Sequence, residues 1–425
     1  MKGSALSELG RRTEAPPISW LMELTLSRPG LISLAAGFTD SETLPVDEVR
    51  ELFEETLHSR KTGQPALQYG LAQGDRALRE LTARHVRRLD GVPDSLRAIA
   101  SDRMIITNGS QQLLYLVTEA LCDTHDIVLV EDPTYFVYLG IVQSRGLRAR
   151  GVRMQADGLE LAHLEQVLDS LKRSGELRRV RLLYLVSCFQ NPTGITTSFE
   201  KKVRILRLLR KYERAAGHPI YLLEDAAYRE LRFQGRDVKS ALAAAGGGDR
   251  VLYAGTYSKP FATGIRVGFG ILPEPVFTTV LRIKGNHDFG TSNLPQQLIA
   301  RALASGRYRK HLGALRKRYA RKAGVMRKAI ERNFPAQVEW TEPEGGLYFW
   351  ARLPQDVRSG TKSRLFQAAL RSEVLYVPGG LCYANDPTRR KPDHEMRLSF
   401  GSATETDIRG GIDRLGAVLH QFLDP

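Results

Sequence analysis

The sequence predicts an α/β fold in which a large domain, built on a mainly parallel sheet flanked by helices, precedes a smaller α+β domain. Short, almost uniformly apolar runs recur in the middle of the chain, at residues 127–131, 181–187 and 220–224. Such runs are typical of parallel strands covered on both faces. Between them lie segments with apolar residues at helical spacing, such as Leu113, Leu116, Val117 and Leu121. This alternation indicates strands separated by helices.

Each domain has its own predicted strands. Those of the large domain are Met104–Thr107, Ile127–Glu131, Arg181–Ser187, Ile220–Glu224, Val251–Ala254 and Val267–Ile271. Those of the small domain are Gly346–Leu353 and Glu395–Phe400. The chain is predicted to end in a helix that begins near Thr404 and Asp407, which can cap it.

We expect three parts along the chain. Residues 1–45 contain Pro16-Pro17, Pro29-Gly30 and Pro45, and are predicted to wrap as an irregular segment onto the small domain and the active site. Residues 46–306 form the large domain. Residues 307–425 form the small domain together with a connecting helix.

Composition narrows the functional class. The 425 residues are 42% hydrophobic and 26% charged, which is ordinary for a globular protein. No apolar stretch approaches the roughly 20 residues needed to span a bilayer, and the start lacks the apolar core of a signal peptide. We therefore expect a cytoplasmic protein without a membrane partner. The three cysteines are too scattered for a zinc site, and the nine histidines show no ligand spacing, so no metal site is expected.

A net charge of +15 raises the question of nucleic-acid binding. Much of it comes from residues 307–328, which contain ten Lys or Arg and no acid. The apolar residues of this stretch recur at helical spacing: Leu312, Leu315, Tyr319, Met326 and Ile330. We interpret it as a helix with one buried face and one solvated basic face, and expect no nucleic-acid partner.

Lys259 is the most informative residue for function. It follows the predicted strand Val251–Ala254, with Ser258 before it and Arg266 seven residues later. A lysine can form a Schiff base with an aldehyde cofactor, while serine and arginine can hold a phosphate. Together they suggest pyridoxal 5'-phosphate (PLP), although a Ser-Lys pair on a loop is more often solvated surface.

Two other predicted strand ends carry suitable partners for such a cofactor. Asp225 can bond the pyridine nitrogen, and Tyr228 and Asn191 can reach the phenolic oxygen. Each has a purely structural alternative, because Asp225 can cap a helix and Asn191 lies in an Asn-Pro-Thr-Gly turn.

Further candidates lie at other strand ends and in the small domain. Ser110 and Gln111 open a helix whose N-terminus suits a phosphate. Tyr135 can stack on the ring or belong to the core. Arg397, in a C-terminal strand, can grip a substrate α-carboxylate or form an internal ion pair.

The spacing of these residues links them. Asn191 to Asp225 and Asp225 to Lys259 are each 34 residues, which fits one helix plus one strand. Single signals are weak, but together they match what one phosphorylated pyridine aldehyde requires.

On these residues the chain resembles the fold-type I PLP-dependent aminotransferases of class I/II, and most nearly the kynurenine/α-aminoadipate aminotransferase branch. The resemblance runs from about residue 30 to the C-terminus, over 90% of the chain. The segments that carry it are Tyr69-Gly70, Asn108–Gln112, Asp132–Tyr135, Asn191–Gly194, Asp225–Tyr228, Ser258-Lys259, Arg266 and Arg397.

The resemblance implies a role for each residue. Lys259 bonds to the cofactor and moves the substrate proton, Asp225 pairs with the pyridinium and Tyr135 stacks on the ring. It assigns the phenolic oxygen to Tyr228 and Asn191, the phosphate to Ser110, Gln111, Ser258 and Arg266, and the substrate to Arg397, Asn191 and Gly37. Tyr69 is expected to reach in from a second subunit of a homodimer with shared active sites.

The chain departs from the family's pattern at two places, of which the first helps to select the substrate in this branch and the second concerns the loop after the lysine. The segment Leu34–Asp40, which contains Gly37, matches the family's N-terminal stretch only loosely, and Pro260 directly after the lysine is less usual. We expect ping-pong transfer of an amino group from an L-amino acid, aromatic or 2-aminoadipate-like, to a 2-oxo acid such as 2-oxoglutarate.

Other functions fit parts of the pattern. The same residues can support a PLP-dependent lyase, racemase, decarboxylase or cyclase, because the reaction depends on which Cα bond stands perpendicular to the ring. A transcription regulator would need a winged helix, for which the roughly 30 residues before the resemblance are too few. A non-catalytic relative is disfavoured by the presence of Lys259, Asp225 and Arg266.

Overall fold

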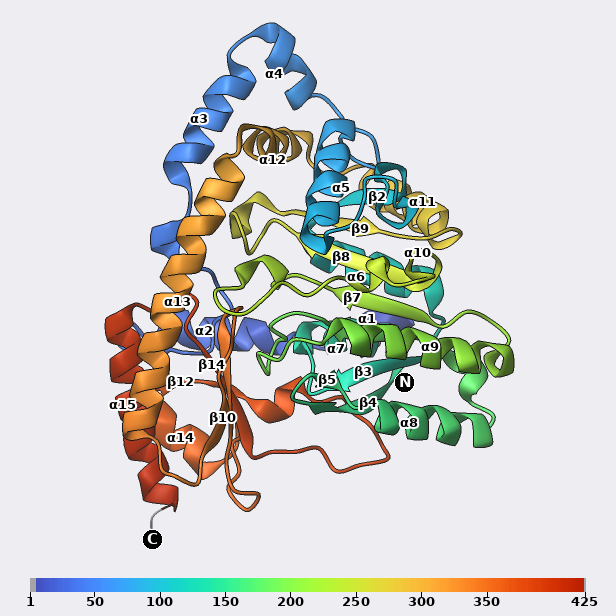
Figure 1. Cartoon of the computed structure of the whole chain (residues 1–425). Coiled ribbons are helices and arrows are strands. Elements are labelled where there is room, and N and C mark those ends of the chain that lie inside the picture. Colours follow the sequence, from blue (N-terminus) through green and yellow to red (C-terminus); the bar gives the residue numbers. More distant parts are fainter. Residues whose placement is uncertain (1–4, 424–425) are drawn as a thin grey trace.

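A computed structural model describes residues 5–423 and contains a large sheet with the strand order β2-β9-β8-β7-β6-β3-β4-β5 (Figure 1). Its strands are β2 Met104–Asn108, β3 Ile127–Asp132, β4 Arg148–Gln155, β5 Gly158–Leu159, β6 Val180–Val186, β7 Tyr221–Asp225, β8 Val251–Thr256 and β9 Val267–Ile271. The pairs β4–β3, β3–β6, β6–β7 and β7–β8 are parallel, whereas β9 runs antiparallel to β8 and β2. The predicted mainly parallel α/β sheet is confirmed.

Helices cover both faces of this sheet because its strand residues alternate between two cores. On β3, Val128 and Val130 face one cluster, with α6 (Gly109–Leu121) and α7 (Phe136–Ser144). Ile127 and Leu129 face the other, with α5 (Arg76–Asp90), α8 (Leu161–Arg173) and α9 (Phe199–Ala216). Remaining helices of this part are α3 Val46–Leu57, α4 Arg60–Leu67, α10 Gly247–Arg250, α11 Val276–Asp288 and α12 Asn293–Ser305. Burial on both faces explains the uniformly apolar strand sequences.

A second sheet has the order β10-β11-β14-β13 and is antiparallel. It comprises β10 Glu339–Thr341, β11 Tyr348–Arg352, β13 Val377–Pro378 and β14 Glu395–Ser399. Helices α13 (Arg307–Asn333), α14 (Arg364–Arg371) and α15 (Glu405–Leu423) accompany it. Thr404 and Asp407 cap α15 reciprocally, as expected, through bonds of 3.0 and 3.3 Å between each backbone amide and the other side chain.

The N-terminal segment differs from its prediction. Rather than being irregular, it contains α1 (Glu8–Arg12), α2 (Pro17–Ser27) and β1 (Ile32–Ser33), which pairs with β12 (Val374–Leu375). Pro17 occupies the first turn of α2, where a missing N–H costs nothing. Strand β4 was not predicted, because arginines at 148, 150 and 153 interrupt the apolar pattern by which buried strands are recognised.

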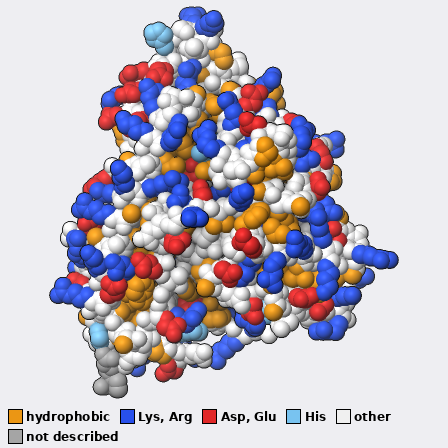
Figure 2. Space-filling model, viewed as in Figure 1, with side chains coloured by type: hydrophobic (Ala, Val, Ile, Leu, Met, Phe, Trp, Pro, Cys, Tyr) orange, Lys and Arg blue, Asp and Glu red, His pale blue; other side chains and the backbone are white. Residues whose placement is uncertain are grey.

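Helix α13 descends along one side of the molecule from α12 to α15 and the small sheet (Figure 1). The predicted stripe of Leu312, Leu315, Tyr319, Met326 and Ile330 is buried. Several of its cations pair with acids, such as Arg307 with Glu51 and Glu55. Figure 2 shows Lys and Arg spread over the visible face with acidic side chains among them. Within residues 5–423, no helix is long and apolar enough to cross a bilayer.

Candidate active site

A cavity of about 230 Å³ opens at the carboxyl ends of strands β6, β7 and β8. Nine predicted site residues line it: Ser110, Gln111, Tyr135, Asn191, Asp225, Tyr228, Ser258, Lys259 and Arg266. They come from the start of α6, the loop before α7 and the loops after those three strands. Parallel strands place their ends at one edge, which brings residues far apart in sequence together.

Lys259 points into this cavity from the loop after β8. Its ammonium donates to the Gly37 carbonyl at 2.7 Å and lies 5.9 Å from the Tyr228 ring centre. Burial, assisted by the charges of Arg397 and Arg266, lowers the pKa of Lys259 to about 8. No carboxylate pairs with it among the residues described. A neutral amine, the nucleophilic form, is therefore accessible near physiological pH.

Asp225 ends β7 and is buried. Oδ2 accepts from the Tyr184 hydroxyl at 2.9 Å and Oδ1 accepts from the Ala227 amide at 3.0 Å. Burial outweighs both bonds and raises the pKa of Asp225 to about 6. The helix cap considered as its structural alternative is not formed, because the short helical turn Arg229–Leu231 begins after Tyr228 and the bond from Ala227 only closes a local turn. The carboxylate lacks a cationic partner in the part of the chain that is described.

Arg397, on β14, is 1% exposed. One guanidinium nitrogen donates to Asn191 Oδ1 and another to the Ala35 carbonyl, both at 2.7 Å, and the group lies 4.3 Å from the Tyr348 ring centre. Among the residues that the structure describes, none hydrogen-bonds to its Nε. The alternative of an internal ion pair is not realised within residues 5–423, so a buried cation lies beside the cavity residue Asn191 without an anion.

Hydrogen bonds through Asn191 and two tyrosine hydroxyls link Arg397 to the cavity. Asn191 Nδ2 donates to the Tyr228 hydroxyl at 3.5 Å, and that hydroxyl shares a hydrogen bond of 2.9 Å with the Tyr348 hydroxyl. Asn191 is thus at once a turn residue and a bridge between Arg397 and Tyr228.

At another end of the cavity, Arg266 donates to the Ser258 hydroxyl at 3.1 Å. Arg266 adopts the left-handed conformation, with φ of 52°. Gly109 also has positive φ, and a Cβ there would lie 2.5 Å from an Arg266 nitrogen. Only glycine permits this approach of the guanidinium to the start of α6, whose free N–H groups favour an anion.

Three predicted residues do not line this cavity: Tyr69, Gly37 and Arg397, which reaches it only through its bond to Asn191. Tyr69 is 83% exposed and packs against Phe289, outside the cavity of its own chain. Gly37 does not line the cavity, but its carbonyl meets Lys259. Sequence reasoning missed Phe38, which lines the cavity, and the hydroxyls of Tyr184 and Tyr348. A tyrosine within the apolar run 181–187 was the available signal for Tyr184.

The residues fit PLP in chemical kind and in position. Lys259 offers an amine, Asp225 an unpaired carboxylate, and Arg266 with Ser258 and the start of α6 an anion cradle that requires Gly109. Arg397 keeps a buried, unpartnered N–H for a further anion.

Comparison with known proteins agrees with this fit. A family model described as aminotransferase class I and II matches residues 29–415. The chain is 33% identical over 416 residues to aromatic-amino-acid aminotransferase 1 of Thermococcus litoralis, covering 98% of this chain and 94% of the relative. It is also 33% identical over 414 residues to 2-aminoadipate transaminase of Thermus thermophilus, covering 97% and 96%.

Among solved structures, kynurenine aminotransferase of Pyrococcus horikoshii, in complex with PMP, superposes with a TM-score of 0.88 at 30% identity, covering 99% of this chain and 98% of that one. PMP is the aminated form of PLP, and these similarities favour amino-group transfer over the lyase, decarboxylase and cyclase alternatives. The chain therefore belongs to the class I and II aminotransferases, PLP-dependent enzymes that move an amino group from an amino acid to a 2-oxo acid.

Proposed function

We propose that Lys259 is both the point of covalent attachment for PLP and the base that takes and returns the substrate α-proton. Its place in the cavity, partly shielded from solvent, and its lowered pKa of about 8 support this, because a neutral amine can do both. Bound PLP supplies an electron sink that weakens the bonds to the substrate α-carbon. Tyr228, whose ring lies near the Lys259 ammonium, helps to hold that ammonium in place.

Other residues hold the cofactor in this proposal. Asp225 bonds the pyridine nitrogen and keeps it protonated, for which its unpaired carboxylate is suited. Tyr135 packs on the ring, and Asn191 and Tyr228 donate to the phenolic oxygen. The phosphate is held by the remaining group: Ser110, Gln111, Ser258 and Arg266.

Arg397 carries the substrate part of the proposal. A buried arginine with an unpartnered Nε and no carboxylate partner within residues 5–423 is costly unless a ligand supplies the anion. The α-carboxylate shared by amino acids and 2-oxo acids would supply it in both halves of the reaction. Asn191 accepts from Arg397 and so can orient it toward the cofactor.

The donor is proposed to be an aromatic or 2-aminoadipate-like L-amino acid, with 2-oxoglutarate as acceptor. The names of the two relatives support these donor classes. Phe38 and Tyr135 line the cavity and offer aromatic surface to such a side chain.

We also propose a homodimer with shared active sites. Leu67, Tyr69, Leu71 and Phe289 are all more than 60% exposed, and Tyr69 contacts Phe289, which is a large apolar surface for a monomer. In a dimer, Tyr69 would reach the partner's cavity. The three-part division at residues 45 and 306 remains a prediction, supported by the confinement of the two sheets to 104–271 and 339–399.

An absorption experiment tests the proposal. The purified enzyme should show a bound-cofactor band that aromatic or 2-aminoadipate donors convert to the aminated form and 2-oxoglutarate restores. Arg397→Met should lower kcat/KM for the donor about 100-fold, while a matched amine without a carboxylate is unaffected. A band that no amino acid converts would disprove the donor assignment, and equal losses for acid and amine would disprove the role of Arg397.

A further inference from the structure

The Leu34–Asp40 segment lies against two cations, Lys259 of the cavity and Arg397 of β14. The Ala35 carbonyl accepts from Arg397 and the Gly37 carbonyl accepts from Lys259, each at 2.7 Å. A Cβ on Gly37 would lie 2.6 Å from the Tyr348 hydroxyl. The backbone of this segment therefore supplies acceptors to the groups proposed to bind the substrate and to move its proton.

The upstream end of the segment is fixed by backbone bonds. The Leu34 amide donates to the Leu375 carbonyl at 2.8 Å, and the Leu34 carbonyl accepts from the Ser399 amide at 2.7 Å. Ser399 ends β14, the strand that carries Arg397. These bonds hold residue 34 but leave residues 35–39 to be positioned from the other end.

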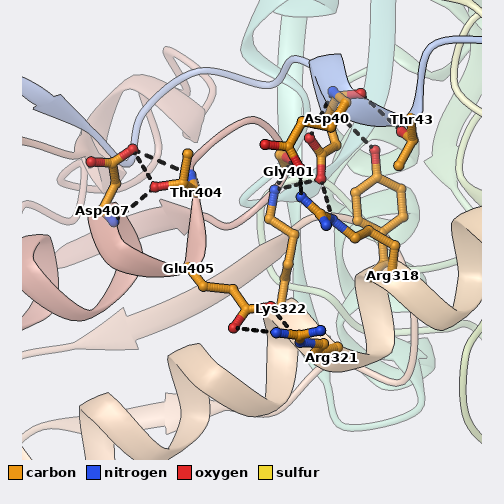
Figure 3. A network of polar contacts seen from close by, with 11 residues as sticks. Asp40, Thr43, Arg318, Arg321, Lys322, Gly401, Thr404, Glu405 and Asp407 are labelled. Carbon is orange, nitrogen blue, oxygen red and sulfur yellow. Dashed lines mark hydrogen bonds and ion pairs between the residues drawn. The ribbon is translucent and has the colours of Figure 1, made fainter.

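The downstream end is fixed by charge. Asp40 is buried, and its Oδ2 accepts from Lys322 at 3.0 Å and from Arg318 at 2.8 Å, both on α13 (Figure 3). The Tyr319 hydroxyl accepts from the Asp40 amide at 3.1 Å. Although burial acts to raise the pKa of Asp40, the bonds from Arg318 and Lys322 keep it below its usual value. The carboxylate is therefore ionised at neutral pH.

Lys322 connects this end back to the strand of Arg397. It is fully buried, and its ammonium also donates to the Gly401 carbonyl at 2.8 Å, just beyond β14 (Figure 3). A Cβ on Gly401 would lie 2.4 Å from the Phe38 carbonyl, so the segment and this turn are in direct contact. We call Asp40, Arg318, Lys322 and the Gly401 carbonyl the Asp40 cluster.

A buried lysine and aspartate are weak contributors to stability, because desolvation offsets their attraction. What such a pair does provide is a fixed geometry between three separate segments of chain. Here those segments are the one that touches Lys259, the helix α13, and the turn after β14.

We propose that Asp40 and Lys322 are positioning residues that hold the 34–40 segment so that its carbonyls meet Lys259 and Arg397. This inference rests on the proposed roles of those two residues. The cluster touches neither the cofactor cavity nor the substrate carboxylate site, and it acts only through the segment.

The double variant D40A/K322M tests this, because it leaves neither charge buried alone and Arg318 keeps Glu42 as a partner. Donor kcat/KM should fall about 10–100-fold, as expected for displaced reacting groups. The Kd for PLP should change by a smaller factor than kcat/KM, since the phosphate and pyridine partners are not attached to the segment and only Lys259 among the proposed cofactor residues contacts it. Lys322→Met alone should lose nearly as much, because Asp40 and Lys322 act together.

Arg321→Ala is the matched control. Arg321 lies on the same helix and pairs with Glu405 beside the cluster, but it does not contact the 34–40 segment (Figure 3). It should keep kcat/KM within about twofold of the wild type.

Hydrogen exchange of the cofactor-free protein gives a readout that does not depend on the reaction. In D40A/K322M, amides of residues 34–44 should exchange at least about tenfold faster, while those of β7 are unchanged. Unchanged exchange at 34–44, unchanged kcat/KM, or a loss that extends to β7 and PLP affinity would each overturn the proposal. Failure of the wild-type enzyme to transaminate would instead refute the proposed function and leave the exchange result standing.

Discussion

Two neighbouring carboxylates on β7 face opposite sides of the sheet and have opposite surroundings. Glu224 pairs with Lys202 at 2.8 Å and accepts from the Ala241 amide at 2.7 Å. Asp225, the next residue, accepts from a tyrosine hydroxyl and a backbone amide, and burial raises its pKa to about 6. Because successive side chains of a strand point to opposite faces, Glu224 lies beside a cation, whereas its neighbour Asp225 does not.

Lys202 and Lys259 differ in the same way as the two carboxylates, one being paired with an opposite charge and the other not. Lys202 is fully buried and paired with Glu224, whereas Lys259 has a carbonyl as its acceptor and a lowered pKa. Lys202 and Glu224, which are buried in the core, neutralise each other. Lys259 and Asp225, which line the cavity, are left for the opposite charges of a bound ligand. Stability and function therefore depend on different members of the same residue type.

The largest effect is expected at the unpaired lysine. Lys259→Ala should lower transamination at least about 10⁴-fold, because attachment and proton transfer are both lost. The melting temperature of the cofactor-free protein should not fall, since no ion pair is broken. Steady-state kinetics and calorimetry check this, and a substantial residual rate would contradict the assignment.

The paired lysine should behave in the opposite way. Lys202→Ala leaves Glu224 buried without its cation and should reduce the free energy of unfolding by about 3–5 kcal/mol. The kcat of the folded enzyme should remain within about threefold. Urea unfolding measures the loss, and adding Glu224→Gln should recover part of it. A Lys202→Ala variant that is stable but inactive would contradict the assignment of Lys202 to stability and not to catalysis.

Asp225→Asn should stabilise the cofactor-free protein while impairing the enzyme. The folded-state pKa of about 6 lies above the ordinary 3.8, so the ionised carboxylate destabilises the fold above about pH 6, and this penalty disappears below about pH 4. At pH 7 the variant should gain about 1–3 kcal/mol. Denaturation at pH 7 and pH 4 tests the sign, and a gain of equal size at both would contradict it.

The smallest effect concerns the titration of Lys259. Because its pKa is lowered to about 8, the rate of PLP uptake by the cofactor-free protein should rise with pH and level off above about 8. Arg397→Met removes one of the repelling charges and should move the midpoint upward by up to about one unit. Stopped-flow absorbance measures both, and identical midpoints for the two proteins would exclude the influence of Arg397.

Much of the cavity could be predicted from local pattern. The runs before Asn191, Asp225 and Lys259 are apolar enough to indicate buried parallel strands, and parallel strands end at one edge of a sheet. The buried face of α13 could also be predicted, because its apolar residues recur at helical spacing over many turns.

The structure of other elements could not be predicted from local sequence pattern, for physical reasons. Strand β4 carries three arginines, and its place in the sheet is decided by pairing with β3 and not by its own pattern. Tyr69, expected to reach the cavity of a second subunit, lies exposed beside Phe289 in the single chain, and its role stays a prediction.

The sequence by itself determined the fold class, the order of the strands that end at the cavity, and nine of the residues that line it, because these follow from periodicity and residue type. Only the tertiary structure decided which buried charges are paired, and it brought the 34–40 segment to Lys259 and Arg397. Those contacts join residues 222 to 362 positions apart, as between Gly37 and Lys259 or Ala35 and Arg397. No local pattern records them, since they arise from packing among three segments distant in sequence.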